Sequence, residues 1–144
     1  MRISLRAWKV TVAAIAVAGC LAQPGRAQAL KAGAAKVDIT PAESELPKNY
    51  EGIHDRIHSR AIVIDNGQTR AALVTLDGNV PPQVWESVTK RAEAELRIPA
   101  VNILMTSSHS HSVPRLPSGL DEKVFQSIKA AVEKLQPARV GYGT

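Results

Sequence analysis

Cysteine is almost absent from this chain of 144 residues, in which Cys20 is the only one. A single cysteine cannot form an internal disulfide or a Cys-x-x-Cys zinc site, and Cys20 lies in an N-terminal leader. Aromatic residues make up only 3% of the chain, whereas apolar residues make up 44%. The core must therefore be aliphatic, and a thiol enzyme or a disulfide scaffold is excluded.

A basic excess is also missing once the leader is set aside. The formal net charge is +5, but four of the 18 Lys and Arg residues lie in positions 1–29, where there is no acid. Residues 30–144 then carry 14 basic and 13 acidic side chains. Nucleic-acid binding requires a clear positive excess, so we exclude nucleic acid as a partner. The sequence also lacks a glycine-rich phosphate loop.

The leader itself has the three parts of a secretory signal peptide. A basic segment, residues 1–9, precedes the apolar run Val10–Ala22, which is shorter than the roughly 20 residues of a transmembrane helix. Ala27-Gln28-Ala29 then fits the Ala-x-Ala rule for cleavage. We therefore expect residues 1–29 to be a signal peptide and residues 30–144 to be secreted or periplasmic.

A second interpretation of the leader stays open. The segment Val17-Ala18-Gly19-Cys20 resembles a lipobox, in which the cysteine is modified with lipid after cleavage. The protein would then be a lipoprotein anchored through Cys20 at a membrane surface.

Strand and helix patterns alternate along residues 30–144. We expect strands over Ala34–Ile39, Arg60–Asp65, Arg70–Leu76, Val101–Met105 and Ala138–Gly143, and helices from Pro81-Pro82 to Arg97-Ile98-Pro99 and from a Ser118/Asp121 capping box to Pro137. In the first helix one apolar stripe is formed at steps of four by Val84, Val88, Ala92 and Leu96. Asn66-Gly67 is typical of a hairpin turn. The two strands beside this turn are apolar without clean alternation, which indicates burial on both faces.

This order of elements predicts an α/β fold with a layered, mixed β-sheet. The chain stops at Thr144, inside or just after an expected strand. We therefore expect an incomplete portion of a larger catalytic domain.

The polar segment Ser107–Ser112 directly follows the strand expected at residues 101–105. In an open α/β sheet, ligands bind at the carboxyl ends of strands. His109 and His111 are two residues apart, so on an extended backbone their side chains point the same way. Two imidazoles supply half of a tetrahedral zinc shell. The pattern favours a metal site at His109 and His111, although a solvated loop without function could have the same sequence.

Other polar residues nearby fit more than one role. His54 beside Asp55 could support a metal ligand, but an exposed position at the entry to the hairpin fits better. Asp77-Gly78 fits both a position facing the histidines and a simple end of a strand. Ser108 adjoins the first histidine, yet neighbours on a strand face opposite ways, and the Gly-x-Ser-x-Gly elbow is missing. Nucleophilic serine catalysis is therefore disfavoured.

Four segments together resemble the N-terminal catalytic region of the neutral/alkaline, non-lysosomal ceramidase family. They occur in the order of the family: Ala32–Pro41 (AGAAKVDITP), Gly52–Asp65 (GIHDRIHSRAIVID), Ala71–Asp77 (AALVTLD) and Val101–Pro114 (VNILMTSSHSHSVP). The last is similar to a strand that leads into an Ala-Thr-His-Thr-His-Ser-Gly-Pro signature, and Pro137–Thr144 resembles a later family segment. The likeness extends over most of residues 30–144, but only over the front part of a much longer catalytic domain.

The resemblance implies a role for each histidine. His109 would ligate a catalytic Zn²⁺, and His111 would help to stabilise the oxyanion at the reaction centre. It also implies hydrolysis of the amide of an N-acyl sphingoid base, a lipid-like substrate of the ceramide class, by zinc-activated water. The products would be sphingosine and a fatty acid, which places the reaction in sphingolipid metabolism, with association to a membrane surface left open.

The chain departs from the family in two respects. Val113 and Arg115 stand where the family usually has glycines, and Ser110 replaces a threonine, so the loop is bulkier and more basic. The remaining zinc ligands of the family, a His, a Glu and a Tyr, lie further downstream, as does its Gly-Asp-Val-Ser-Pro motif. Two histidines make an incomplete shell, so we expect an N-terminal fragment that is not a competent enzyme by itself.

Two alternatives remain. A metallo-β-lactamase-like hydrolase also has His-x-His after a strand, but its signature continues with Asp and His, where this chain has Val113-Pro114. A secreted or lipid-anchored module that kept the sheet and lost the chemistry would not be an enzyme. Downstream His, Glu and Tyr motifs in the gene would favour the hydrolase, and a stop codon would favour the module.

Overall fold

The computed structural model describes residues 29–113 and 117–143. In chain order its main elements are β1 (Lys31–Asp38), β2 (His58–Asp65), β3 (Arg70–Leu76), α1 (Pro82–Leu96), β4 (Ile103–Ser107), α2 (Leu120–Glu133) and β5 (Gln136–Pro137). The leader, with its expected cleavage signal and lipobox, falls almost wholly outside the described residues, and so does Arg115. The predicted α/β fold with a mixed sheet is confirmed.

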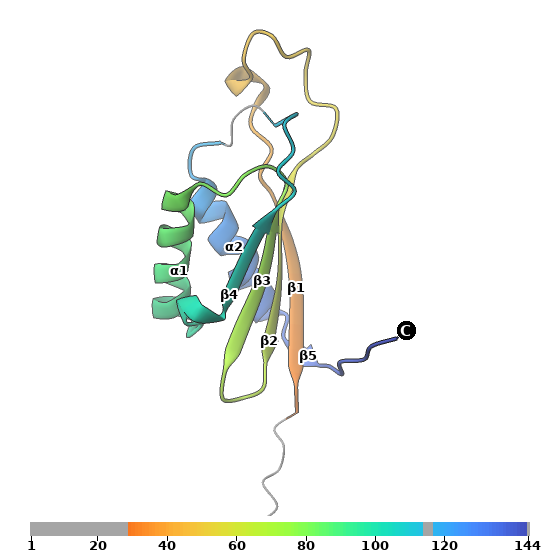
Figure 1. Ribbon diagram of the computed structural model, residues 1–144, viewed down its shortest axis with the longest axis vertical. Coiled ribbons are helices and arrows are strands. Elements are labelled where there is room, and N and C mark those ends of the chain that lie inside the picture. The colour runs from red at the N-terminus through yellow and green to blue at the C-terminus, as the bar shows by residue number, and fades with distance from the viewer. Residues whose placement is uncertain (1–28, 114–116, 144) are drawn as a thin grey trace, which may run out of the picture.

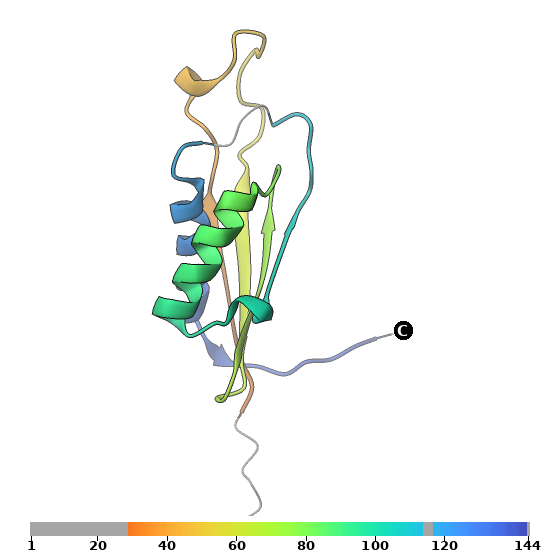
Figure 2. The same cartoon turned by 60° about the vertical axis from the view of Figure 1, so that its left-hand side comes forward.

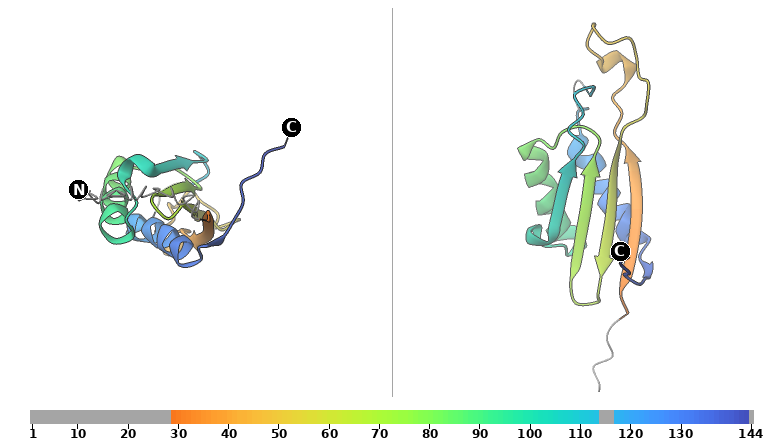
Figure 3. Two further views of the ribbon diagram at one scale, coloured as in Figure 1. Left: turned by 90° about the horizontal axis from the view of Figure 1, so that it is seen from below. Right: turned by 45° about the vertical axis from the view of Figure 1, so that its right-hand side comes forward.

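The five strands form one sheet in the order β4-β3-β2-β1-β5. β3 and β4 are parallel, and the other neighbouring pairs are antiparallel. As a result, β1, β3 and β4 all run in one direction, and their carboxyl ends meet the start of β2 at the same end of the sheet (Figure 3). The long loops of the chain gather at this end (Figure 1).

Both helices cover the same face of the sheet, as the view in Figure 2 makes clear. α2 lies against β1 and β2, and α1 packs beside α2. The apolar side chains of the core between helices and sheet are aliphatic apart from Phe125, as the composition predicts. The fully buried ones include Val63, Val74, Leu76, Val88, Val124 and Ile128. Within residues 29–113 and 117–143, neither helix has the length and apolar character needed to cross a bilayer.

The hairpin between β2 and β3 forms at the predicted place, but with a four-residue loop. Gly67 adopts a positive φ of 83°, and the side-chain oxygen of Asn66 accepts hydrogen bonds from the amides of Gln68 and Thr69. The prediction that both faces of the hairpin are buried is wrong for this chain. Ile62 and Leu73 remain 46% and 45% exposed, because both helices lie on the opposite face.

Helix α1 begins at Pro82, and its buried Val84, Val88 and Ala92 form the predicted stripe. The capping box predicted for α2 is absent, because Gly119 takes the N-cap position with φ 71°. The carboxylate of Asp121 instead accepts a hydrogen bond of 2.7 Å from the hydroxyl of Ser87 on α1. That contact joins the two helices, and no local sequence pattern reveals it.

The strand predicted over Ala138–Gly143 is also wrong. Only Gln136–Pro137 pair with β1, and the amide of Ala138 donates to the carbonyl of Leu30. Beyond this point Tyr142 is 97% exposed. The apolar residues among positions 138–143 suggested a strand, but the pairing with β1 ends at Pro137.

Candidate active site

The ends of β3 and β4 carry the candidate site. Ser107, the last residue of β4, pairs with Leu76, the last residue of β3. The amide of Ser108 then donates to the carbonyl of Leu76 at 2.9 Å, and the amide of His109 donates to the carbonyl of Gly78 at 2.9 Å. The loop that follows β4 therefore continues along the turn that follows β3 and is fixed by it.

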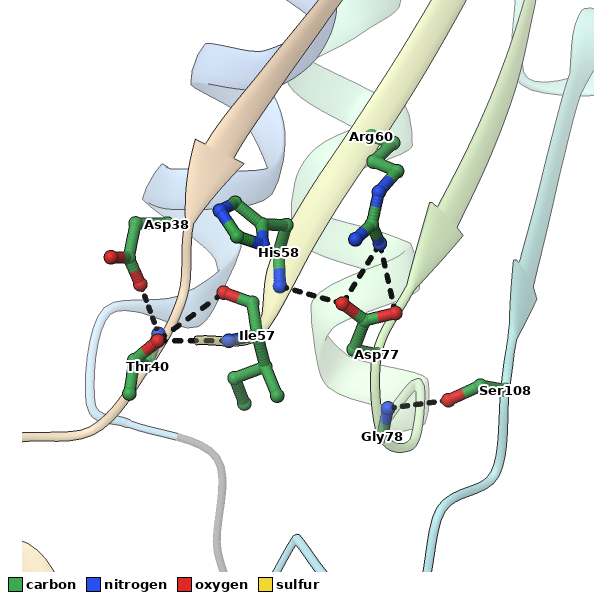
Figure 4. Close-up of polar contacts among 8 residues, drawn as sticks. All are labelled: Asp38, Thr40, Ile57, His58, Arg60, Asp77, Gly78 and Ser108. Carbon is green, nitrogen blue, oxygen red and sulfur yellow. Dashed lines mark hydrogen bonds and ion pairs between the residues drawn. The ribbon is translucent and has the colours of Figure 1, made fainter. Parts of the chain in front are cut away.

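The side chain of Ser108 takes part in the same contact. Its hydroxyl oxygen accepts a hydrogen bond of 3.1 Å from the amide of Gly78 (Figure 4). The Asp77-Gly78 pair thus lies beside His109. The sequence left open whether this pair lies near the histidines or only ends the strand, and the structure shows the former. Gly78 has φ 115°, a conformation that residues with a side chain rarely adopt.

The rings of His109 and His111 stack, with centroids 5.2 Å apart and planes inclined by 22°. Both residues are exposed. The sequence predicted that the rings would converge, but it attributed this to an extended backbone. The strand ends at Ser107, and His109 has a left-handed φ of 53°, so a turn rather than a strand brings the rings together.

The stacked rings place two imidazole groups side by side in one loop. Neutral imidazole is a common ligand for Zn²⁺, so these two donors fit the chemistry of a zinc site. A third ligand is not provided by the described part of the chain, where no group of three or more His, Cys, Asp or Glu side chains is placed to hold a metal. The described residues therefore contain no complete metal site, and the two histidines are its candidate ligands.

The carboxylate of Asp77, in the turn beside His109, accepts three hydrogen bonds from β2. One of its carboxylate oxygens accepts the amide of His58 at 2.9 Å, and both accept from the guanidinium of Arg60 at 2.8 Å (Figure 4). Burial raises the pKa of the Asp77 carboxyl, but the hydrogen bonds from Arg60 and His58 and the charge of Arg60 outweigh it, so the pKa lies below its ordinary value. Asp77 is therefore a fixed negative charge that ties β3 to β2.

A second set of polar contacts closes the base of the loop over residues 41–56. The amide of Ile39 donates to the carbonyl of Ile57. The amide of Ile57 donates to the hydroxyl of Thr40 at 3.0 Å (Figure 4). Asp38 accepts from the amide of Thr40 and from Arg56. Hydrogen bonding to Thr40 and the ion pair with Arg56 lower the pKa of Asp38 to about 2.

This loop and the histidine loop line a half-open cavity of about 470 Å³. The histidine loop contributes Ser110, Ser112 and Val113, and the facing loop contributes Leu46, Tyr50, Gly52, Ile53, His54 and Asp55, with Thr40, Pro41 and Ile57 at its base. The wall is therefore mostly apolar, with the hydroxyl groups of two serines on the side of the histidine loop, and the rings of His109 and His111 are not part of it. The sequence did not predict this cavity, because its two walls lie more than 50 residues apart along the chain.

The remaining histidines lie outside the stacked pair. His54 bonds to Asp55 at 2.9 Å, and the side chains are 96% and 86% exposed, so the exposed position favoured by the sequence is confirmed. His58 has a buried Nδ1 without a hydrogen-bond partner among the described residues. The structure brings neither of these rings into the group formed by His109 and His111.

The chain is similar in fold to neutral ceramidases of known structure. One neighbour is a ceramidase in complex with C2, with a TM-score of 0.60 and 25% sequence identity over 76% of this chain. Another is neutral ceramidase from Pseudomonas aeruginosa, with a TM-score of 0.58 and the same identity and coverage. The resemblance drawn from the four sequence segments is therefore confirmed by the fold. No protein-family model and no curated protein matches the chain.

The chain spans 22% of the length of these two structures. The α/β unit described above thus corresponds to one part of a much larger ceramidase fold.

Proposed function

We propose that this chain is part of a zinc-dependent amide hydrolase of the ceramidase type. The observation that carries the proposal is the stacked pair His109 and His111 at the carboxyl end of β4. This pair stands in a fold similar to that of neutral ceramidases, at the sheet edge where α/β proteins bind ligands. The fold similarity supports a ceramidase-like hydrolase, and the histidine pair supports the use of zinc.

The two histidines have different proposed roles. The resemblance to the ceramidase family assigns the metal to His109, whose amide is held by the carbonyl of Gly78 in the turn after β3. The same resemblance gives His111 the role of donating a hydrogen bond to the substrate carbonyl oxygen as negative charge develops there. When bound, Zn²⁺ would polarise the scissile carbonyl and lower the pKa of water towards about 7.

The cavity beside the loop fits the hydrocarbon part of a lipid-like amide. Leu46, Ile53 and Val113 give it apolar surface, while Ser110 and Ser112 offer hydroxyl groups close to the histidines. A substrate with an apolar chain and a polar amide would match this division. Ceramides have this composition, so the cavity supports the ceramide class as substrate.

The test is hydrolysis of a short-chain fluorescent ceramide by the complete gene product. We expect release of the fluorescent fatty acid, loss of activity with a zinc chelator, and recovery on addition of Zn²⁺. Gln68→Ala is the control for His109→Ala, because Gln68 is exposed in the hairpin at the opposite end of the sheet and does not line the cavity. The proposal is contradicted if the product is not released, or if chelation or His109→Ala leaves the rate unchanged.

Export is proposed from the leader alone. A signal peptide over residues 1–29 would deliver the protein to the periplasm or the exterior, and lipid modification of Cys20 would hold it at a membrane surface. Either destination would bring the site to its lipid substrate from outside the cytoplasm.

A further inference from the structure

The backbone of His109 adopts a conformation that needs support. Its φ of 53° is left-handed, which is unfavourable for a residue with a β-carbon. Such residues persist only where surrounding contacts hold them, and they concentrate at functional sites. The left-handed turn is also what places the ring of His109 against that of His111, so whatever holds this turn sets the geometry of the pair.

Three hydrogen bonds between the ends of β3 and β4 provide the support. The amides of Ser108 and His109 donate to the carbonyls of Leu76 and Gly78, and the amide of Gly78 donates back to the hydroxyl oxygen of Ser108. The Ser108 hydroxyl makes the one side-chain contact among the three. It stands immediately before the residue with the left-handed turn, so its loss would loosen the turn at its starting point.

Asp77 fixes the turn after β3, which contacts Ser108, against the start of β2. Its own amide donates to the carbonyl of His58 at 3.0 Å, and its carboxylate accepts from the amide of the same residue at 2.9 Å. Arg60 binds both carboxylate oxygens at 2.8 Å. The turn that contacts Ser108 is therefore anchored to β2 by charge as well as by the ladder (Figure 4).

We propose that Ser108 and Asp77 are positioning residues for the histidine pair. The carboxylate of Asp77 holds the Asp77-Gly78 turn, and through Gly78 the hydroxyl of Ser108 keeps His109 in its left-handed conformation. The importance of this geometry for zinc rests on the proposed function, but the positioning itself does not. Ser108, disfavoured by its sequence context as a nucleophile, thus acquires a role through its hydroxyl oxygen as an acceptor.

The test is nuclear magnetic resonance of the full chain with Ser108→Ala, Ser108→Thr and Asp77→Asn. Hydrogen exchange of the His109 amide is measured relative to that of Val63 in the central strand β2, together with the nuclear Overhauser contact between the two rings. We expect Ser108→Ala and Asp77→Asn to speed exchange at His109 by about two- to tenfold relative to Val63, the equivalent of one ordinary hydrogen bond, and to weaken the ring contact. Ser108→Thr keeps the hydroxyl and should behave as the unaltered chain.

Asp65→Asn is the matched control. Asp65 also ends a strand, accepts from Arg70 at 2.7 Å and from the amide of Gly67, but lies at the opposite end of β2. It should leave exchange at His109 unchanged relative to Val63. An equal effect of Asp65→Asn and Asp77→Asn would overturn the inference, because it would indicate a general loss of stability.

Two further outcomes would overturn it. One is unchanged exchange at His109 in both Ser108→Ala and Asp77→Asn, and the other is failure of Ser108→Thr to restore the behaviour lost in Ser108→Ala. The proposed function is tested separately by equilibrium dialysis with Zn²⁺. If His109→Ala binds zinc as well as the unaltered chain, the proposed zinc site fails, while the exchange data still decide the positioning role.

Discussion

The hydroxyl groups of Ser59 and Ser127 meet in the core, 2.9 Å apart, and join β2 to α2. Both residues are fully buried. The Ser127 hydroxyl donates to the carbonyl of Val124 at 2.7 Å, so it accepts the hydrogen bond from Ser59. Because Ser59 is the donor and Ser127 the acceptor, the loss of each hydroxyl should have a different effect on stability.

Removing Ser127 should cost more than removing Ser59. Ser127→Ala leaves the hydroxyl of Ser59 as a buried donor without its partner, which costs about 1–3 kcal/mol in the free energy of unfolding. Ser59→Ala leaves Ser127 bound to Val124 and should be milder. Urea unfolding of both variants checks this, with exposed Ser44→Ala as the control. Equal losses in the two core variants would contradict the assigned direction of the hydrogen bond.

Gly33 is required by the close approach of α2 to β1. A methyl group at this position would overlap the carbonyl oxygen of Ala131 in the last turns of the helix. Gly33→Ala should therefore destabilise the fold by about 1–3 kcal/mol through overpacking. Gly141→Ala, where a β-carbon would meet nothing within 4 Å, is the matched control and should have no effect on the thermal midpoint.

The same contact shows what the sequence could not predict. The expected first strand began at Ala34, but β1 begins at Lys31 and includes Gly33. Glycine is a poor strand former, so local preference argued against these residues. Their place in the sheet is set by pairing with β2 and by the helix above, which are contacts distant in the sequence.

Where a signal was local, the sequence predicted it well. The bounds of β3 followed from an apolar run beside the Asn66-Gly67 turn, and the buried stripe of α1 followed from apolar residues at steps of four. The convergence of His109 and His111 was predicted, but from an extended backbone that the structure does not have. The turn that brings the rings together was missed, because it depends on Gly78 at the end of another strand. The ion pair between Arg60 and Asp77 was missed as well, because it depends on the pairing of β2 with β3.

Acid should destabilise the fold below about pH 4. Hydrogen bonding to Thr40 and the ion pair with Arg56 lower the pKa of Asp38 from 3.8 to about 2, and the pKa values of Asp65 and Asp77 are also lowered. The unfolded chain then takes up protons first as the pH falls, so the stability contributed by these carboxylates is lost between about pH 4 and pH 2.

Urea unfolding midpoints measured from pH 6 to pH 2.5 check this prediction. The midpoint should fall with acid, and Asp38→Asn should reduce the slope because its titrating group is gone. Asp55→Asn is a control, since Asp55 is 86% exposed and its one ion-pair partner is the equally exposed His54. A midpoint that stays constant or rises below pH 4 would show that these carboxylates do not stabilise the fold.

The leader gives a prediction about the mature N-terminus. Ala27-Gln28-Ala29 should direct cleavage before Leu30, and intact-mass analysis of the exported protein should show Leu30 as its first residue. Ala29→Leu should block processing, because the rule requires a small residue at this position. A lipid-modified Cys20 at the N-terminus would contradict cleavage at Leu30 and establish the lipoprotein alternative.

The two histidines should fail differently when they are replaced in the complete gene product. His111→Ala should keep its zinc but lose about 10²–10³-fold in kcat, the usual cost of a removed oxyanion donor. His109→Ala should lose zinc and activity together. Turnover of a short-chain fluorescent ceramide gives the rates, and Gln68→Ala, at the opposite end of the sheet, should match the unaltered protein in both properties.

The zinc content of purified His109→Ala, determined by elemental analysis beside the unaltered protein and His111→Ala, tests the zinc site most directly. The roles proposed for the stacked rings predict that zinc is lost in His109→Ala and retained in His111→Ala. Equal zinc in His109→Ala and the unaltered protein would contradict the proposed metal centre. Equal loss in both variants would make His111 a second ligand and contradict the role given to it here.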